Sequence, residues 1–217
     1  SVAIDRSARN ATITVSAPAT AQPTDIAGIE AAGVHWWPLQ MARELDDAIL
    51  HLRTNETDIG TWVLKTAGDA QHVLACDATM AALRTHWLVR ETIGLLRRTF
   101  ARIDVSSRSL FALIEEGTCF AGTLAELAFA ADRAYMLELP DTPEKAPHIV
   151  LSELNLGSFP MVNHQSRLAR RFYEEVEPLE RVRGVIGQRL VRVLCPQCRE
   201  AHVADQAECE LLGAARQ

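Results

Sequence analysis

Residues 116–132 decide the fold that we expect, and they read Glu116-Gly117-Thr118-Cys119-Phe120-Ala121-Gly122-Thr123-Leu124-Ala125-Glu126-Leu127-Ala128-Phe129-Ala130-Ala131-Asp132. They follow the apolar run 110–114, whose length and residue types are those of a buried strand. After a turn with two glycines, apolar residues recur on one side of a helix, at Leu124, Leu127, Ala128 and Ala131. A strand that stops at glycines and leads into a helix leaves backbone N–H groups unpaired. The stretch therefore predicts a place where a negative oxygen can be held.

Strands and helices alternate along the rest of the chain, which predicts an α/β domain. The expected strands are residues 2–4, 11–15, 61–65, 73–74, 110–114, 135–137 and 148–151. The expected helices are 41–53, 86–103 and the segments that start near 124 and 166. Residues 16–33 are rich in Ala, Pro and Thr and predict a surface loop, with Trp36 and Trp37 packed beneath it.

Composition narrows the class of protein. The 217 residues are 48% apolar and 23% charged, which suits one large globular domain or one domain with a small appendage. A net charge of −6 argues against a nucleic-acid surface. We expect no membrane span, because no apolar run is long enough, and no signal peptide, because Asp5, Arg6 and Arg9 interrupt the N-terminus. Five cysteines do not suggest a secreted disulfide scaffold, so we expect a cytoplasmic protein.

Several pieces of the sequence resemble a known superfamily. Residues 116–132 resemble the second oxyanion-hole motif of the crotonase (enoyl-CoA hydratase/isomerase) superfamily, and residues 152–160 and 165–168 resemble its later motifs. Residues 36–39, 42–49 and 90–98 are similar to the benzoyl-CoA-dihydrodiol lyase family within it. The resemblance runs from Ser1 to about Gly187 and corresponds to the second of two crotonase-like repeats. It implies a crotonase-like ββα spiral for residues 1–187.

The resemblance also implies an activity and its partners. Enzymes of this family hydrolytically open the ring of a dihydrodiol or epoxide form of benzoyl-CoA, giving an aldehyde-bearing acyl-CoA and formate. The ligand is an acyl-CoA thioester, and no metal or redox cofactor is needed. The family's catalytic glutamates lie on the first repeat, which these residues do not contain. The alternative is a non-catalytic repeat that serves structure or assembly, with a homodimer as one outcome of an exposed apolar face.

Site residues follow from the same resemblance. The N–H groups of Gly122 and of Cys76, in the stretch Leu74-Ala75-Cys76-Asp77-Ala78, correspond to the oxyanion-hole donors. Asp77 stands where the family has glycine, and its charge would repel a developing oxyanion. Glu126 and Glu153 match the positions of the acid/base carboxylates. The structural alternative is that Glu126 forms a salt bridge or caps its helix and that Glu153 ends a strand.

The last thirty residues change character. Residues 185–198 resemble the start of the C-terminal zinc module of type II secretion and type IV pilus assembly ATPases, and no phosphate-binding loop accompanies them. Cys195 and Cys198 have metal-ligand spacing, but that module uses four cysteines, so they predict half a zinc site. Alternatively, His202 and Cys209 would supply the two other ligands of a zinc site. We therefore expect residues 188–217 to be a truncated tail of different origin, joined near residues 183–190.

Overall fold

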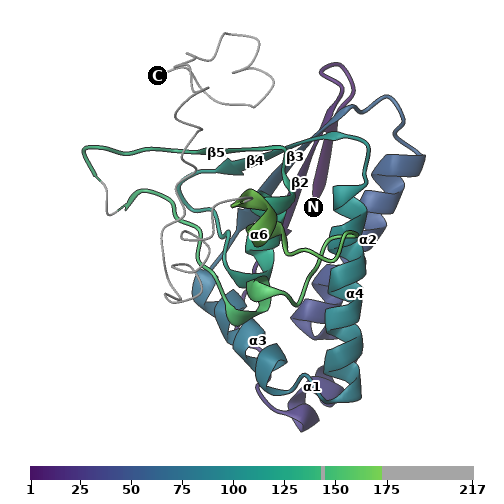
Figure 1. Cartoon of the computed structure of the whole chain (residues 1–217), viewed down its shortest axis with the longest axis vertical. Coiled ribbons are helices and arrows are strands. Elements are labelled where there is room, and N and C mark those ends of the chain that lie inside the picture. The colour runs from purple at the N-terminus through teal and green to yellow at the C-terminus, as the bar shows by residue number, and fades with distance from the viewer. Residues whose placement is uncertain (143–144, 173–217) are drawn as a thin grey trace.

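The computed structural model describes residues 1–142 and 145–172, and these form a sheet with helices beneath it in the view of Figure 1. The five strands lie side by side in chain order. Their bounds are β1 Val2–Asp5, β2 Asn10–Ser16, β3 Thr61–Ala67, β4 Ser109–Ile114 and β5 Arg133–Met136. β1 and β2 pair antiparallel, and every later neighbour is parallel. Parallel neighbours need crossover connections, which the helices supply.

The helices fill the connections between the parallel strands and the segment after β5. The α-helices are α1 Ile26–Ala32, α2 Trp37–Thr54, α3 Ala70–Ala82, α4 Trp87–Asp104, α5 Ala125–Ala130 and α6 Arg167–Arg171. Short 3₁₀ turns are η1 Gly33–His35, η2 Gly122–Leu124 and η4 Glu153–Leu156. The predicted α/β class is confirmed by this arrangement of sheet and helices.

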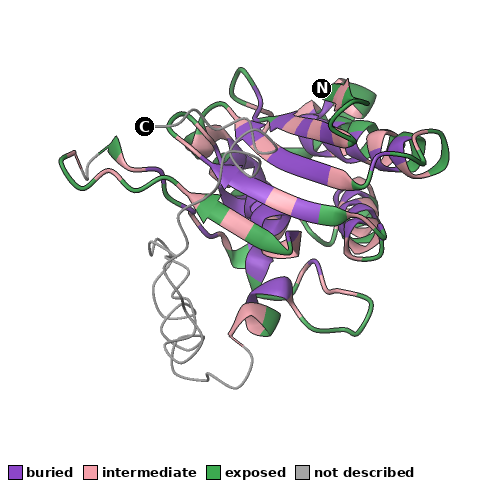
Figure 2. Cartoon of the chain, turned by 90° about the horizontal axis from the view of Figure 1, so that it is seen from above, coloured by how far each residue is buried: buried purple, intermediate pink, exposed green. Residues whose placement is uncertain are grey.

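The core lies between the sheet and the helices. Alternate residues of the strands are buried there, so that Trp62 and Leu64 of β3 are 0% and 1% exposed. On α4, Leu96, Phe100 and Ile103 recur at helical spacing and are buried as well. Figure 2, which views the sheet from above, shows buried residues along its central strands. The strands predicted at residues 2–4 and 11–15 and the helix predicted for residues 86–103 are confirmed.

The strand predicted at residues 73–74 is wrong, because this segment belongs to α3. The Asp69 carboxylate caps that helix by accepting the N–H of Gln71 at 2.8 Å. Val73, Cys76 and Met80 then share a buried helical face. The four apolar residues in a row from Val73 to Cys76 are compatible with a strand, but the buried residues of this segment have the spacing of a helix. Asp77 of the candidate site is therefore held on a helix.

Two further predictions needed correction. The predicted loop 16–33 contains α1, which Asp25 caps by accepting the N–H of Gly28 at 2.7 Å. The predicted strand 148–151 forms only a single parallel bridge, between Ala121 and Val150. The packing predicted for the tryptophans is confirmed, since Trp36 is fully buried and the Trp37 indole donates to the Ser16 carbonyl at 3.0 Å.

Candidate functional site

The candidate site lies where α3, the turn at η2 and residues 150–153 meet. The side chain of Asp77 connects the three segments and is 1% exposed. One carboxylate oxygen accepts the Thr123 hydroxyl at 2.6 Å, and the other accepts the Thr123 N–H at 2.7 Å and the Ser152 hydroxyl at 2.6 Å. The buried carboxylate is therefore solvated by the protein instead of by water.

Desolvation dominates the chemistry of Asp77. Burial raises the pKa of this carboxyl to about 6, while the three hydrogen bonds from Ser152 and Thr123 act in the opposite direction. Desolvation also raises the pKa of the neighbouring Cys76 thiol to about 12, and the charge of Asp77 adds to that shift. At neutral pH the Cys76 side chain is therefore a thiol and not a reactive thiolate.

The two predicted oxyanion donors do not converge as free N–H groups in this structure. The N–H of Gly122 donates to the Val150 carbonyl at 2.8 Å, as part of the bridge that follows β4. Cys76 lies inside α3, where its N–H belongs to the helical hydrogen-bond ladder. The donor that faces an anion is instead the N–H of Thr123, and the anion is Asp77. An oxyanion role for Cys76 and Gly122 therefore remains an expectation from the resemblance alone.

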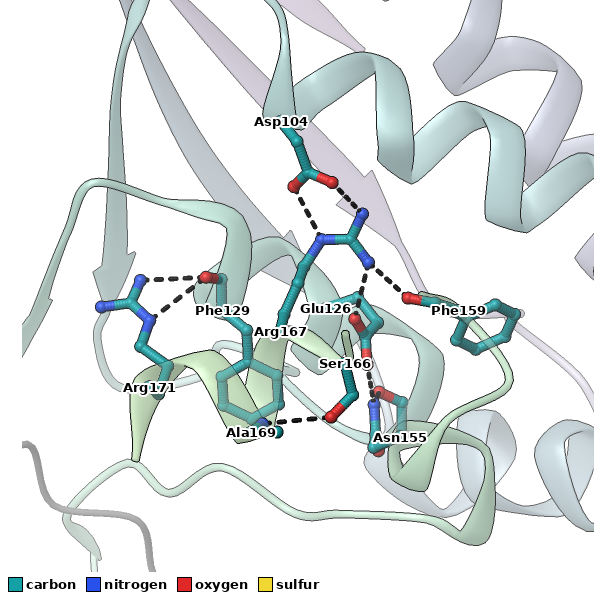
Figure 3. Close-up of polar contacts among 10 residues, drawn as sticks. Asp104, Glu126, Phe129, Asn155, Phe159, Ser166, Arg167, Ala169 and Arg171 are labelled. Atoms are coloured by element: carbon teal, nitrogen blue, oxygen red, sulfur yellow. Dashed lines mark hydrogen bonds and ion pairs between the residues drawn. The ribbon is translucent and has the colours of Figure 1, made fainter. Parts of the chain in front are cut away.

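Glu126 lies in a buried charge network, which Figure 3 shows. Its carboxylate is paired with Arg167 at 3.0 Å and accepts the Asn155 amide at 2.7 Å. Arg167 also donates to both carboxylate oxygens of Asp104, at 2.8 and 2.6 Å, and to the Phe159 carbonyl at 2.8 Å. The network joins α4, α5, η4 and α6. The salt bridge that the structural alternative predicts for Glu126 is thus present.

Burial sets the protonation of Glu126. Desolvation raises the pKa of this carboxyl to about 7, against the opposing effects of Arg167 and Asn155, and the charge of Asp104 adds to the rise. Desolvation also raises the pKa of Asp104. Asp104 and Glu126 are both buried and share the Arg167 guanidinium, so one positive charge offsets only part of their combined negative charge.

Glu153 has a different environment. It begins η4, its side chain is 66% exposed, and it lies 4.0 Å from the Arg84 guanidinium. It ends no strand, because residues 148–151 form only a single bridge. Glu126 is sealed in the core while Glu153 faces solvent, so the structure does not bring these two carboxylates into one shared environment.

A groove of about 530 Å³ runs beside this site. Asp77, Ser152 and Glu153 supply its polar groups, and the rest of its lining is apolar: Leu74, Ala78, Ala81, Ala82, Val150 and Leu151. Such a groove suits an apolar ligand with one oriented polar end. Among these polar groups, the Asp77 carboxylate already accepts hydrogen bonds from Thr123 and Ser152.

Several residues of the site were not found from the sequence. Ser152, Asn155 and Arg167 complete the two polar clusters, and each comes from a segment distant in the chain from its partner. One local signal existed: Ser152 and Asn155 form a capping box around η4. No spacing rule could have shown that the Asn155 amide also donates to Gly122 and Glu126.

The predicted tail site, with Cys195, Cys198, His202 and Cys209, lies outside the described residues, as does the expected boundary near residue 187. Within residues 1–142 and 145–172, no group of three or more His, Cys, Asp or Glu side chains could hold a metal ion. In the same part of the chain, no helix has the length and apolar character needed to cross a membrane.

Most of the chain is similar in sequence to a known protein. Over 187 residues, 86% of the chain, the sequence is 59% identical to benzoyl-CoA-dihydrodiol lyase from Aromatoleum evansii. The chain is similar to one segment of that lyase. The resemblance predicted from the motifs is thus confirmed. The chain spans about a third of the relative's length, since the match covers 33% of it.

A second relative matches a shorter stretch. Type II secretion system protein E from Pseudomonas aeruginosa is 46% identical over 66 residues, which are 30% of this chain and 13% of that protein. The second predicted resemblance is confirmed as well. The two aligned lengths together exceed the chain, so the matches share residues and do not mark a boundary. No family model matches the chain.

Two solved enoyl-CoA hydratases are similar in structure. The protein from Geobacillus kaustophilus has a TM-score of 0.48 and 19% identity, and covers 79% of this chain with 55% of its own. The protein from Bacillus halodurans has a TM-score of 0.44 and 18% identity, and covers 88% of this chain with 66% of its own.

Proposed function

We propose that this chain is part of a ring-opening lyase of benzoyl-CoA breakdown and that it supports the fold of that enzyme without supplying the acid and base. The identity to a segment of the lyase supports the first half of the proposal. The second half rests on Glu126. Its carboxylate is bonded to Arg167 and Asn155 and is 1% exposed, so it has no open face for a substrate.

Acid and base catalysis require a carboxyl group within hydrogen-bond reach of the reacting atoms. Moving Glu126 toward a ligand would break its pairing with Arg167 and leave charges unpaired in the core. Asp77 adds a second obstacle, because its carboxylate holds the Thr123 N–H that would otherwise polarise an acyl oxygen. The acyl-CoA thioester is therefore a substrate of the whole enzyme, and the catalytic acid and base come from the remaining repeat.

The test uses the complete lyase that contains this segment. We expect the Glu126→Gln enzyme to keep kcat within a few-fold of the wild type, measured at a temperature where it is folded. If Glu126 were a positioned acid or base, its removal would lower the rate by about 10²–10⁴. Glu153→Gln is the matched control at the other family position. A fall of 100-fold or more in kcat for Glu126→Gln, with an unchanged circular dichroism spectrum, would refute the structural role.

The chain alone provides the complementary test. Added to a benzoyl-CoA dihydrodiol or epoxide substrate, it should form no aldehyde acyl-CoA above the buffer control, whereas co-expression with the remaining repeat should restore turnover. Turnover by the chain alone would contradict our placement of the catalytic groups on the other repeat.

For the tail, we propose that residues 195–198 are the Cys-x-x-Cys part of a zinc module. Cys195 and Cys198 are two of the four ligands that a tetrahedral zinc site needs, and half a site binds zinc poorly. Metal analysis of the purified chain tests this directly. Stoichiometric zinc would show that other residues, such as His202 and Cys209, complete the site.

A further inference from the structure

The position of the Asp77 carboxylate has the properties of an anion-binding site. Two hydroxyl groups and one backbone N–H converge on it, and they come from two segments other than α3. An ionised carboxylate only accepts hydrogen bonds, so the hydroxyls of Thr123 and Ser152 both donate. Asp77 is itself 1% exposed and Thr123 is fully buried, so this is an enclosed cluster and not a surface contact.

The backbone around this position leaves room for an anion. Gly122 has a φ of +47°, and a Cβ atom built on it would lie 2.1 Å from the nearer Asp77 oxygen and 3.4 Å from the Ser152 hydroxyl. A side chain at residue 122 and a carboxylate at this position therefore exclude each other. Glycine is needed here because the anion occupies the space that a side chain would fill.

The position is also connected to the groove. Asp77 and Ser152 both line the groove of about 530 Å³, whose remaining wall is largely apolar. A small molecule that enters the groove would therefore meet these groups once the carboxylate is removed. With the carboxylate in place, a second negative oxygen would lie close to a like charge in a poorly solvated environment, which is unfavourable.

We propose that Asp77 is the resident anion of a carboxylate-binding position and that it determines what the groove accepts. In the native chain the groove takes apolar groups but no anionic or acyl oxygen at Thr123. Removal of the Asp77 carboxylate turns the position into a site for a small free carboxylate. This inference does not depend on the lyase proposal, because it concerns binding and its readout is stability.

The experiment is chemical rescue of Asp77→Ala with sodium formate. Formate matches the missing carboxylate in size, whereas the methyl group of acetate would meet the Cβ atom of the alanine. The urea midpoint of each variant is measured against formate, acetate and chloride at equal ionic strength, at a pH well above the pKa of Asp77. Asp77→Asn fills the position with an amide, and Asp132→Ala removes an exposed carboxylate that accepts the Leu110 N–H at 2.8 Å.

We expect formate to raise the midpoint of Asp77→Ala along a binding curve, with acetate weaker and chloride without effect. A ligand of three heavy atoms binds no tighter than about millimolar, so the titration extends to roughly 0.5 M. Wild type, Asp77→Asn and Asp132→Ala should respond to formate only as they do to chloride. If Asp77→Ala is unfolded in chloride, the fraction folded in formate is the readout, and a saturable rise supports the proposal.

Two results would overturn it. The first is an equal response of Asp77→Ala to formate and chloride, whether measured as a midpoint or as a fraction folded. The second is an equal formate response in Asp77→Asn, where the position is filled. The first would show that the three donors do not form an anion site, and the second would place the bound formate elsewhere.

Discussion

Replacing Arg167 by methionine should be among the most destabilising substitutions in this chain. Its side chain is 1% exposed and is bonded to Asp104 and Glu126, whose side chains are 4% and 2% exposed. It also lies over the Phe100 ring at 5.7 Å. Methionine keeps much of the apolar volume but leaves two buried carboxylates without a cation. Removing one partner of a buried ion pair costs about 3–5 kcal/mol.

This cost converts to a measurable shift. With a urea m-value of about 2 kcal/mol/M, the unfolding midpoint should fall by about 1.5–2.5 M. Fluorescence of the buried tryptophans and circular dichroism should report the same transition. The matched control is Arg90→Met on the same helix as Asp104. Arg90 is 64% exposed and pairs with Glu91, so its loss should stay below about 0.5 kcal/mol.

A double variant tests the cause. Adding Glu126→Gln to Arg167→Met removes one of the two unpaired carboxylates, so the double variant should be more stable than the sum of the single losses implies. Additive losses, or a loss below about 1 kcal/mol for Arg167→Met alone, would show that the network is not what stabilises this region.

Three other outcomes are expected. Gly122→Ala should lower the free energy of unfolding by at least about 3 kcal/mol, because its Cβ would lie 2.1 Å from an Asp77 oxygen. Gly117→Ala, with φ +79° and open space around it, should lower it by about 1–2 kcal/mol. Equal losses in urea unfolding would contradict the steric reason. The pKa of Glu126 is raised from 4.5 to about 7 in the folded chain. Between these two values the folded chain keeps a proton that the unfolded chain has lost, so stability falls as pH rises through this range. Glu126→Gln lacks this dependence, so it should destabilise more at about pH 5 than at about pH 8, and the opposite order would refute the sign. Glu153→Gln should change the midpoint by the equivalent of less than about 0.5 kcal/mol at either pH, since its side chain is 66% exposed.

Local patterns predicted the elements that have one strong periodicity. The helix at 86–103 and the strand at 110–114 were found within a residue or so, because apolar residues recur on one face of each. Prediction failed at residues 73–74, where a short apolar run fits strand and helix equally well. It also failed at α1, a helix of seven residues with only Ile29 buried. Such a helix has little periodic signal, and its cap at Asp25 is the main sign of it.

The sequence by itself determined the α/β class, the glycine turn that begins at residue 117 and the resemblance to an acyl-CoA lyase, because each depends on residues close together in the chain. It also showed that Asp77 stands where glycine is expected. Only the tertiary structure decided what that carboxylate does, since its partners at Thr123 and Ser152 are 46 and 75 residues away. The same holds for Glu126, which becomes a core ion pair because Arg167 returns 41 residues later. Protonation and hydrogen bonding depend on distances in space and on burial, and neither can be read from spacing along the chain.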